Sequence, residues 1–137
     1  MKIIQVTGRS NSGKTTFIKT LIPQLNKKGR VAVIKHLADH EYILEKGKDT
    51  TLFFAAGADI STGIDGDKSV VAIRNNSLDT ILKLLKALGM DYVVIEGFKE
   101  RNFKKIVIGD LQIEGCILRD PAVEDVVSSV DQFDTYN

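Results

Sequence analysis

The sequence predicts an α/β fold of three layers, α/β/α, with a mostly parallel central sheet and one additional β-hairpin. Apolar, β-branched segments alternate with segments of helical periodicity along the chain, which is the pattern of βα units. The segment Arg30–Lys35 is apolar without alternation, as expected for a strand that helices cover on both faces. A strand, a helix and a second strand in this order form a right-handed βαβ unit.

Length and composition favour one ordinary globular domain. The chain has 137 residues, which suits a single domain, residues 1–137, with one core. Its net charge of +1 indicates no general affinity for nucleic acid. The one cysteine, Cys116, lies in an apolar segment and allows no internal disulfide. The N-terminus enters a strand without a signal sequence, and no apolar segment approaches the length of a membrane span, so we expect a cytoplasmic protein without membrane contact.

The first strand is expected at Lys2–Thr7, which is short, mostly apolar and β-branched. A helix is expected from about Gly13 to Lys28, with Gly29 ending it. Pro23 falls inside this helix and should bend it, because proline removes one backbone hydrogen bond. The apolar positions of the helix recur at steps of three and four residues: Phe17, Ile18, Leu21, Ile22 and Leu25.

Two segments beyond Lys35 also have helical character. Thr51–Ala56 is a short apolar segment that Asp49 or Thr50 is expected to cap. Ser77 is the expected cap of a longer helix. The apolar residues of that helix form a stripe that indicates a core face: Leu78, Ile81, Leu82, Leu85 and Leu88.

A β-hairpin is expected between these two helices. Its strands are Ala58–Ile64 and Ser69–Ile73. The sequence Asp-Gly-Asp-Lys at residues 65–68 is typical of a tight turn. We prefer this interpretation to a metal site at Asp65 and Asp67.

One segment matches the pattern G-x-x-x-x-G-K-[ST] at every fixed position: Gly8, Arg9, Ser10, Asn11, Ser12, Gly13, Lys14 and Thr15. It lies between a strand and a helix, the context of a phosphate-binding P-loop. Glycine lets the turn point successive N–H groups at phosphate oxygens, and the helix N-terminus adds its positive end. Lys14 is expected to reach the β- and γ-phosphates, the Thr15 hydroxyl to bind Mg²⁺, and Thr16 to lie near the α-phosphate. The sequence therefore predicts a nucleotide-binding domain of the P-loop NTPase class.

Glu96 is the predicted second catalytic and metal-binding residue beside Lys14. It follows four apolar residues of the segment Asp91–Gly97, which places a carboxylate at the tip of a buried strand. P-loop proteins need an acid there to hold Mg²⁺ or its water shell.

Lys35 and His36 end the second strand, at the edge where α/β sheets bind their ligands. His36 and His40 are four residues apart, so a zinc pair is conceivable. No third ligand is evident, and we prefer polar loop residues near the nucleotide or its partner substrate.

The segment Phe98–Lys105 combines four cations with two aromatic residues. Such a mixture can bind nucleic acid, but the near-zero net charge favours a patch for an anionic small molecule or a partner protein. A solvated loop remains open. Beyond it, Lys105–Ile108 and part of Gln112–Leu118 are expected strands. Asp120 is the expected cap, with Pro121 at the first position, of a short helix at Val123–Val130.

The chain resembles the B proteins of molybdopterin guanine dinucleotide biosynthesis (the MobB family), which are P-loop GTP-binding proteins. Separated segments share motifs with that family, in this order: Gly8–Thr16 with Leu21–Leu25, Val33–His36, Gly47–Thr50 with Ala56–Ala58, Val94–Lys99, and Lys105–Val107. The segments Ile-Lys-His and Glu-Gly-Phe-Lys are more specific to the family than the phosphate loop is. Leu37–Tyr42 matches the family's loop rich in histidine and aspartate only in part.

The resemblance implies binding of GTP and Mg²⁺, weak intrinsic GTP hydrolysis, and a homodimer. It also implies a partner protein, the molybdopterin guanylyltransferase, which joins GMP to molybdopterin. By position, Gly13, Lys14, Thr15 and Glu96 take the phosphate and magnesium roles, and Lys35 and His36 are motif positions. No Asn-Lys-x-Asp motif for guanine is present, and the segment containing Asp120 is the candidate loop for the base.

Hydrolysis requires a positioned water, a neutralised γ-phosphate and usually an additional cation. Lys14 and Mg²⁺ would supply the neutralisation, while Arg9 and Arg101 are the candidates for the additional cation. Because no water-positioning glutamine is evident, we expect slow turnover.

Two other function classes remain open. One is an ATP-dependent, synthetase-like enzyme that acts on a small metabolite and uses a strand-end Glu-Gly in the same place. The other is a metallochaperone GTPase, which two histidines and one cysteine make less favourable.

Overall fold

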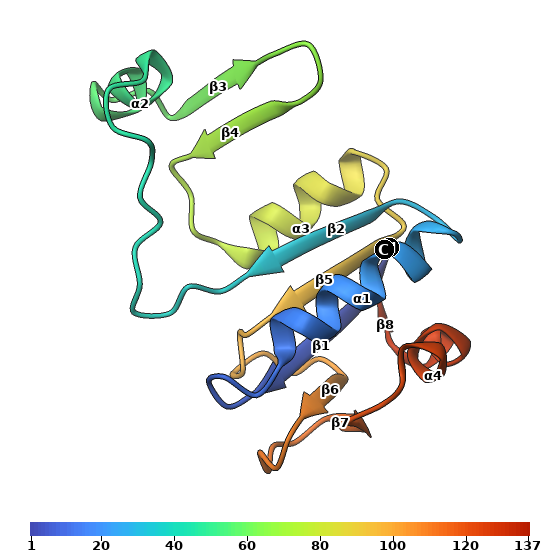
Figure 1. Ribbon diagram of the computed structural model, residues 1–137. Coiled ribbons are helices and arrows are strands. Elements are labelled where there is room, and N and C mark those ends of the chain that lie inside the picture. The colour runs from blue at the N-terminus through green and yellow to red at the C-terminus, as the bar shows by residue number, and fades with distance from the viewer. The chain divides into compact units, whose positions relative to one another are not determined.

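The computed structural model describes residues 1–137 and confirms the α/β class, with a mostly parallel central sheet and a separate antiparallel hairpin (Figure 1). The chain forms two compact units. We call residues 1–38 with 82–137 the sheet unit, and residues 39–81 the hairpin unit. No helix combines the length and the apolar character needed to cross a membrane.

The central sheet places β1 (Lys2–Gly8), the strand that leads into residues 8–15, between other strands. Its main strands are β1 (Lys2–Gly8), β2 (Val31–Lys35), β5 (Tyr92–Glu96), β6 (Lys105–Ile108) and β7 (Cys116–Arg119). They lie in the order β2-β5-β1-β6-β7, and every neighbouring pair is parallel. The carboxyl ends of all five strands therefore share one edge of the sheet.

A sixth strand, β8 (Asp134–Thr135), pairs antiparallel with the first residues of β1. It fills the stretch of β1 that β6 does not reach, because β6 pairs with β1 only from Gln5 onward. A strand of two residues has no periodicity to read, and the sequence analysis does not predict it.

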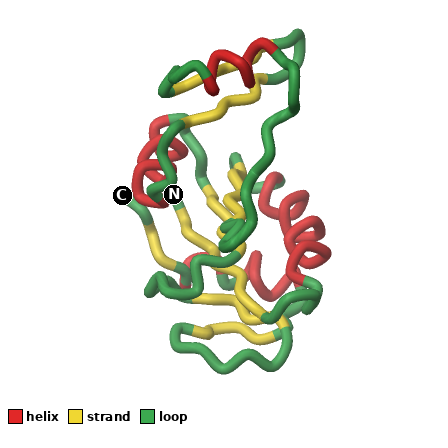
Figure 2. Tube along the Cα trace, turned by 90° about the vertical axis from the view of Figure 1, so that its left-hand side faces the viewer, coloured by secondary structure: helices red, strands yellow, loops and turns green.

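Helices lie on both sides of the central sheet (Figure 2), which gives the three predicted layers. On one side, α1 (Lys14–Asn26) and α4 (Val123–Ser128) contact each other and pack on the sheet. Leu21 and Leu25 of α1 are fully buried, and each contributes about 2–3 kcal/mol by leaving water. α1 runs through Pro23 as one continuous helix. α3 (Leu78–Ala87) begins after Ser77, whose Oγ accepts a hydrogen bond from the Thr80 N–H at 3.3 Å, as predicted for a cap.

The hairpin unit contains α2 (Asp49–Ala55), β3 (Ile60–Ile64) and β4 (Ser69–Ile73). Asp65 is a turn residue, as preferred above. Its Oδ1 accepts the N–H groups of Asp67 and Lys68 at 2.7 and 2.8 Å, and its Oδ2 pairs with the Lys68 ammonium at 2.8 Å.

Two predicted helix caps are wrong. Asp49 and Thr50 lie inside α2, whose flanking residue is Lys48, and the Asp49 charge instead favours the helix dipole from the first turn. Asp120 does not cap α4, because its Oδ1 accepts the N–H of Gly109 at 2.8 Å.

The residue before α4 is Ala122, and its N–H donates to the Asp125 carboxylate at 3.2 Å. The Asp125 side chain thus reaches back from the first turn of α4 and accepts a hydrogen bond at the helix N-terminus. Ala122 itself has no side chain that could cap the helix. The predicted helix Val123–Val130 is in fact α4 followed by a separate 3₁₀ turn at Val130–Gln132.

Candidate functional site

The segment between β1 and α1 forms a tight loop at the carboxyl edge of the sheet. The Ser12 N–H donates to the Arg9 carbonyl at 3.2 Å, and Asn11 and Gly13 have left-handed φ values of 61° and 98°. Gly8 is required for a different reason, the closeness of β6. A Cβ on Gly8 would lie 2.5 Å from the carbonyl oxygen of Ile108, which no side chain tolerates.

Lys14 folds back over this loop. Its Nζ donates to the carbonyl oxygens of Gly8 at 3.0 Å and Arg9 at 2.7 Å. Burial lowers the pKa of Lys14, and the Glu96 carboxylate acts in the opposite direction. Its two hydrogen bonds therefore hold the ammonium group against the backbone of the loop.

The start of α1 offers donors for an anion. The Phe17 N–H donates to the Gly13 carbonyl at 3.0 Å, so the N–H groups of Lys14, Thr15 and Thr16 precede the first helical bond and have no acceptor in the helix. The Ser12 hydroxyl is buried without a hydrogen-bond partner in the protein. A buried hydroxyl without a partner is costly, and a phosphate oxygen is a suitable acceptor for it.

Glu96 lies at the end of β5, beside both β1 and β2. It is in register with Val6 on one side and with Lys35 on the other. Its side chain is 13% exposed, and Oε1 lies 3.3 Å from the Lys35 ammonium. The structure thus brings together three of the predicted site residues, Lys14, Lys35 and Glu96.

His36 joins the same group through its backbone and its ring. Its N–H donates to the Glu96 carbonyl at 2.9 Å, and its imidazole stacks on the Phe98 ring with a centroid distance of 4.1 Å and an interplanar angle of 13°. His40 belongs to the hairpin unit. Nowhere along residues 1–137 do three or more His, Cys, Asp or Glu side chains gather in a metal-binding arrangement, so the zinc-pair alternative gains no support.

Gln5 is a residue of this site that the sequence analysis does not single out. It is fully buried, and its Nε2 donates to the carbonyl oxygens of Gly97 and Phe98 at 2.7 Å each. These bonds hold Phe98 at φ 52°, a left-handed conformation that is uncommon for an aromatic residue. The sequence feature that could have identified Gln5 is a polar residue in the middle of an apolar strand.

Asp120 lies on the other side of β1, next to the loop that follows β6. Besides the Asp120 bond to Gly109, the Arg119 guanidinium donates to the carbonyl oxygens of Gly109 at 2.6 Å and Leu111 at 2.9 Å. These bonds join the segment containing Asp120, the candidate for base contact, to the loop that follows β6.

Arg9 is held by the same loop. Its Nε lies 3.0 Å from Oδ1 of Asp110, and both side chains are exposed. The Arg9 guanidinium lowers the pKa of the Asp110 carboxyl by hydrogen bonding and by its charge. Arg9 is thus directed at a carboxylate and not at the centre of the loop between β1 and α1.

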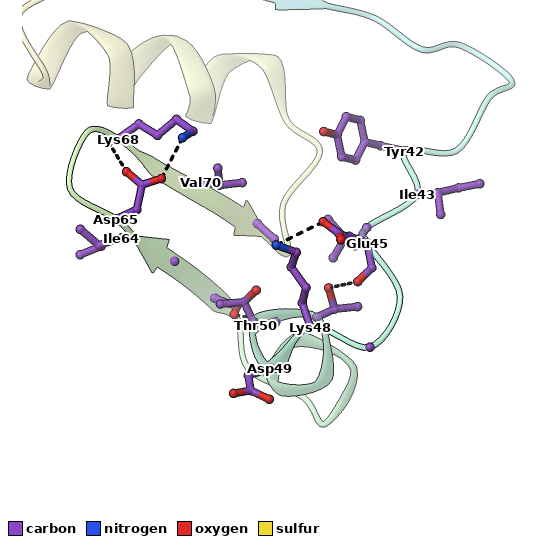
Figure 3. A pocket seen from close by; sticks show the side chains of 16 residues that line it. Tyr42, Ile43, Glu45, Lys48, Asp49, Thr50, Ile64, Asp65, Lys68 and Val70 are labelled. Carbon is purple, nitrogen blue, oxygen red and sulfur yellow. Dashed lines mark hydrogen bonds and ion pairs between the residues drawn. The ribbon is translucent and has the colours of Figure 1, made fainter.

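The hairpin unit has a cavity of about 800 Å³ between residues 42–51 and the β3–β4 hairpin (Figure 3). Its lysines are already paired, Lys48 with Glu45 at 3.3 Å and Lys68 with Asp65 at 2.8 Å. None of the predicted site residues lines it. The predicted site residues therefore lie at the carboxyl edge of the sheet and not in this cavity.

Comparison with known proteins gives relatives along most of the chain. The Haemophilus influenzae molybdopterin-guanine dinucleotide biosynthesis adapter protein is 31% identical over 110 residues, which are 77% of this chain and 62% of that protein. A Bacillus subtilis relative is 38% identical over 111 residues, 77% of this chain and 64% of that protein. A Methanocaldococcus jannaschii relative is 38% identical over 112 residues, 79% of this chain and 47% of that protein. The chain thus spans between about half and just under two thirds of the length of these relatives.

Solved structures share the fold. The crystal structure of Bacillus subtilis MobB superposes with a TM-score of 0.75 at 26% identity, covering 95% of this chain and 98% of that chain. A MobB homologue from Bacillus stearothermophilus gives a TM-score of 0.59 at 24% identity, covering 100% of this chain and 75% of that chain. The fold class predicted from the sequence is thereby confirmed. The model of the family described as "Molybdopterin guanine dinucleotide synthesis protein B" matches residues 3–129, and this chain belongs to that family, MobB.

Proposed function

We propose that this chain is a GTP-binding adapter in the biosynthesis of the molybdenum cofactor molybdopterin guanine dinucleotide, with weak Mg²⁺-dependent GTP hydrolysis. The main support is the loop between β1 and α1, in which the Lys14 ammonium lies 3.0 and 2.7 Å from the Gly8 and Arg9 carbonyl oxygens. The adapter name of the Haemophilus influenzae relative supports the pathway.

The residues of the loop fit a nucleoside triphosphate. Phosphate oxygens would accept from the N–H groups at the start of α1 and from the Ser12 hydroxyl, while Lys14 would exchange its carbonyl partners for the β- and γ-phosphates. The Thr15 hydroxyl and the Glu96 carboxylate are oxygen ligands of the kind that Mg²⁺ prefers. When bound, Mg²⁺ would neutralise negative charge on the β- and γ-phosphates.

The same geometry favours slow hydrolysis. Arg9 is engaged with Asp110 at 3.0 Å, and the Lys35 ammonium compensates part of the Glu96 charge at 3.3 Å. Neither Arg9 nor Lys35 has a carboxylate or an amide that could orient an attacking water. We therefore expect a GTPase whose activity depends on a partner or on dimerisation.

Protein contacts are the third part of the proposal. The hairpin unit exposes Ile60, Ile64 and Val71 on one face of a two-stranded sheet, and a two-stranded sheet needs further packing to be stable. We propose that this face supports a homodimer, and that the chain serves a molybdopterin guanylyltransferase partner in the cytoplasm.

The test is calorimetric titration with GTPγS and with ATPγS, each with Mg²⁺, on the wild type and on Lys14→Ala. We expect the wild type to bind GTPγS selectively and the variant to lose that binding. A preference for ATPγS would overturn the guanine assignment in favour of a synthetase-like enzyme. Unchanged binding by Lys14→Ala would overturn the phosphate-loop assignment itself.

A further inference from the structure

Asp120 presents a carboxylate at the carboxyl edge of the sheet, directly after the last residue of β7. Its backbone N–H donates to the Val107 carbonyl at 2.9 Å, and its φ of 44° is left-handed. Aspartate adopts this conformation more readily than most residues, although it remains uncommon. An unusual backbone conformation thus places an exposed acidic residue at the edge where α/β sheets bind their ligands.

The carboxylate is held in place by one hydrogen bond and keeps acceptor capacity for a ligand. Its Oδ1 accepts the Gly109 N–H at 2.8 Å. An ionised carboxylate has about four acceptor positions on its two oxygens, so a single backbone N–H leaves both oxygens able to accept from a second molecule.

Gly109 connects Asp120 to the loop between β1 and α1. A Cβ on Gly109 would lie 3.8 Å from the Ser12 Cβ, which is ordinary contact distance. The Arg119 guanidinium donates to the carbonyl oxygens of Gly109 at 2.6 Å and Leu111 at 2.9 Å. The carboxylate is therefore bonded to a segment that itself borders the proposed phosphate site.

The strand order sets the direction in which a nucleotide would extend from that site. Glu96, the proposed magnesium ligand, ends β5, which lies on one side of β1, whereas β6 and β7 lie on the other (Figure 1). Terminal phosphates that share this ion lie toward β5, so the nucleoside extends over β6 and β7. Neighbouring strands are about 4.8 Å apart, which puts the end of β7 roughly 10 Å from β1, a span that a nucleoside covers.

Resting on the proposed nucleotide site, we propose that Asp120 selects the base, by accepting hydrogen bonds from the N1–H and the exocyclic amino group of guanine. These two donors lie side by side on one edge of guanine and match the two oxygens of a carboxylate. Adenine has an acceptor at N1, which a carboxylate repels. A site built around such hydrogen bonds rejects bases that lack the donors, and it does so here without an Asn-Lys-x-Asp motif.

The test is calorimetric titration with nucleoside diphosphates and Mg²⁺, because these ligands have no γ-phosphate to be hydrolysed. Inosine diphosphate differs from GDP only in lacking the exocyclic amino group, and we expect the wild type to bind it about tenfold more weakly. In Asp120→Ala the two ligands should bind equally, because the acceptor is gone. Equal affinities in the wild type, or an undiminished preference for GDP in Asp120→Ala, overturn the proposal.

Asp120→Asn gives a test by gain of binding, which only a folded protein can show. The variant keeps an oxygen for the Gly109 N–H and replaces the second acceptor by a donor. Xanthosine diphosphate has a carbonyl oxygen where GDP has its amino group, so it complements the new amide. We expect Asp120→Asn to bind GDP about tenfold more weakly than the wild type does, and xanthosine diphosphate about tenfold more tightly. A variant that keeps the wild-type preference overturns the proposal.

The matched control is Glu124→Gln, which removes the same charge from an exposed residue in the first turn of α4. Its affinities for GDP, inosine diphosphate and xanthosine diphosphate should equal those of the wild type. The same gain for xanthosine diphosphate in Glu124→Gln as in Asp120→Asn would show that the lost charge, and not contact with the base, causes the effect, and would overturn the proposal.

Calorimetry with Mg²⁺ and GTPγS on the same samples separates this proposal from the one on which it rests. Binding of GTPγS that depends on Lys14, with an unchanged base preference in both Asp120 variants, refutes the role of Asp120 and leaves the nucleotide site standing. A wild type that binds no guanine nucleotide refutes the nucleotide site and this proposal with it. A wild-type preference for ADP over GDP refutes guanine selection by Asp120 and leaves only the phosphate site.

Discussion

Gln5 offers a direct test of how the loop after β5 is held. The side chain is fully buried in the central strand, and its Nε2 makes two hydrogen bonds of 2.7 Å, to the carbonyl oxygens of Gly97 and Phe98. The substitution Gln5→Leu keeps the approximate volume and removes both bonds. The Thr7→Val substitution is the matched control, because Thr7 is also buried in β1 but makes only one long side-chain bond, 3.5 Å to the Ile106 carbonyl.

The expected magnitude follows from these contacts. Two hydrogen bonds contribute about 1 kcal/mol each, and their loss also leaves two carbonyl oxygens without this donor. The Gln5 Oε1 is buried without a partner, so its removal returns part of the loss, on the order of 1 kcal/mol. We therefore expect Gln5→Leu to lower the free energy of unfolding by about 1–3 kcal/mol and Thr7→Val to lower it by less than about 1 kcal/mol.

The assay is urea unfolding followed by circular dichroism, with the slope of the transition compared between variants. Calorimetry with Mg²⁺ and GTPγS accompanies it, because Glu96 directly precedes the loosened loop and its carboxylate should be less well placed. A Gln5→Leu variant with wild-type stability and wild-type nucleotide affinity would refute the assigned role of Gln5. Equal losses in Gln5→Leu and Thr7→Val would show that burial of polarity, and not the loop bonds, sets the effect.

Three further outcomes are expected. Burial lowers the pKa of Lys105, so at alkaline pH the unfolded chain binds more protons than the folded one, and stability should rise with pH up to the ordinary lysine pKa of 10.5. Urea unfolding at pH 8 and 10 should show a smaller rise in Lys105→Met than in the wild type, since the Lys14 contribution to the rise remains in both. Asp110→Asn should tighten binding of Mg²⁺–GTPγS in calorimetry, since it removes a negative charge near the phosphate loop and releases Arg9 from its 3.0 Å ion pair; the same gain in an Arg9→Ala background would contradict the release of Arg9 as the cause. Gly8→Ala should destabilise the fold by about 1–3 kcal/mol in urea unfolding, because its Cβ would lie 2.5 Å from a backbone oxygen of β6, whereas Gly66→Ala has open space around the new carbon and should be nearly neutral.

The parts of the site that the sequence predicted are those encoded by local patterns. The phosphate loop is a continuous segment between a strand and a helix, and Glu96 follows an apolar run directly. In both cases the position of the side chains follows from the end of a single strand. The proximity of Lys35 to Glu96 also follows, once parallel pairing of β2 and β5 is assumed.

Other parts depend on contacts between distant segments. The role of Gln5 requires the loop after β5 to cross β1, and the Arg9–Asp110 pair joins residues that no local pattern relates. The wrong cap at Asp120 has the same origin, because its carboxylate is used by Gly109 across β6 and β7. The capping propensity of an aspartate depends on its local sequence and cannot reveal a hydrogen-bond donor from a distant segment, such as the Gly109 N–H for Asp120.

The central position of β1 has a consequence during protein synthesis. This strand is synthesised well before its neighbours: Val6 pairs with Glu96, and Lys2 pairs with Thr135. Phe133, which is synthesised later than β5, belongs to the same core cluster as Ile4. With translation at about 5–20 residues per second, the nascent chain exposes an unpaired apolar strand for several seconds. The loop at the end of that strand therefore gains its shape only after β5 and β6 have been synthesised, and we expect nascent chains that lack these strands to have no affinity for nucleotide.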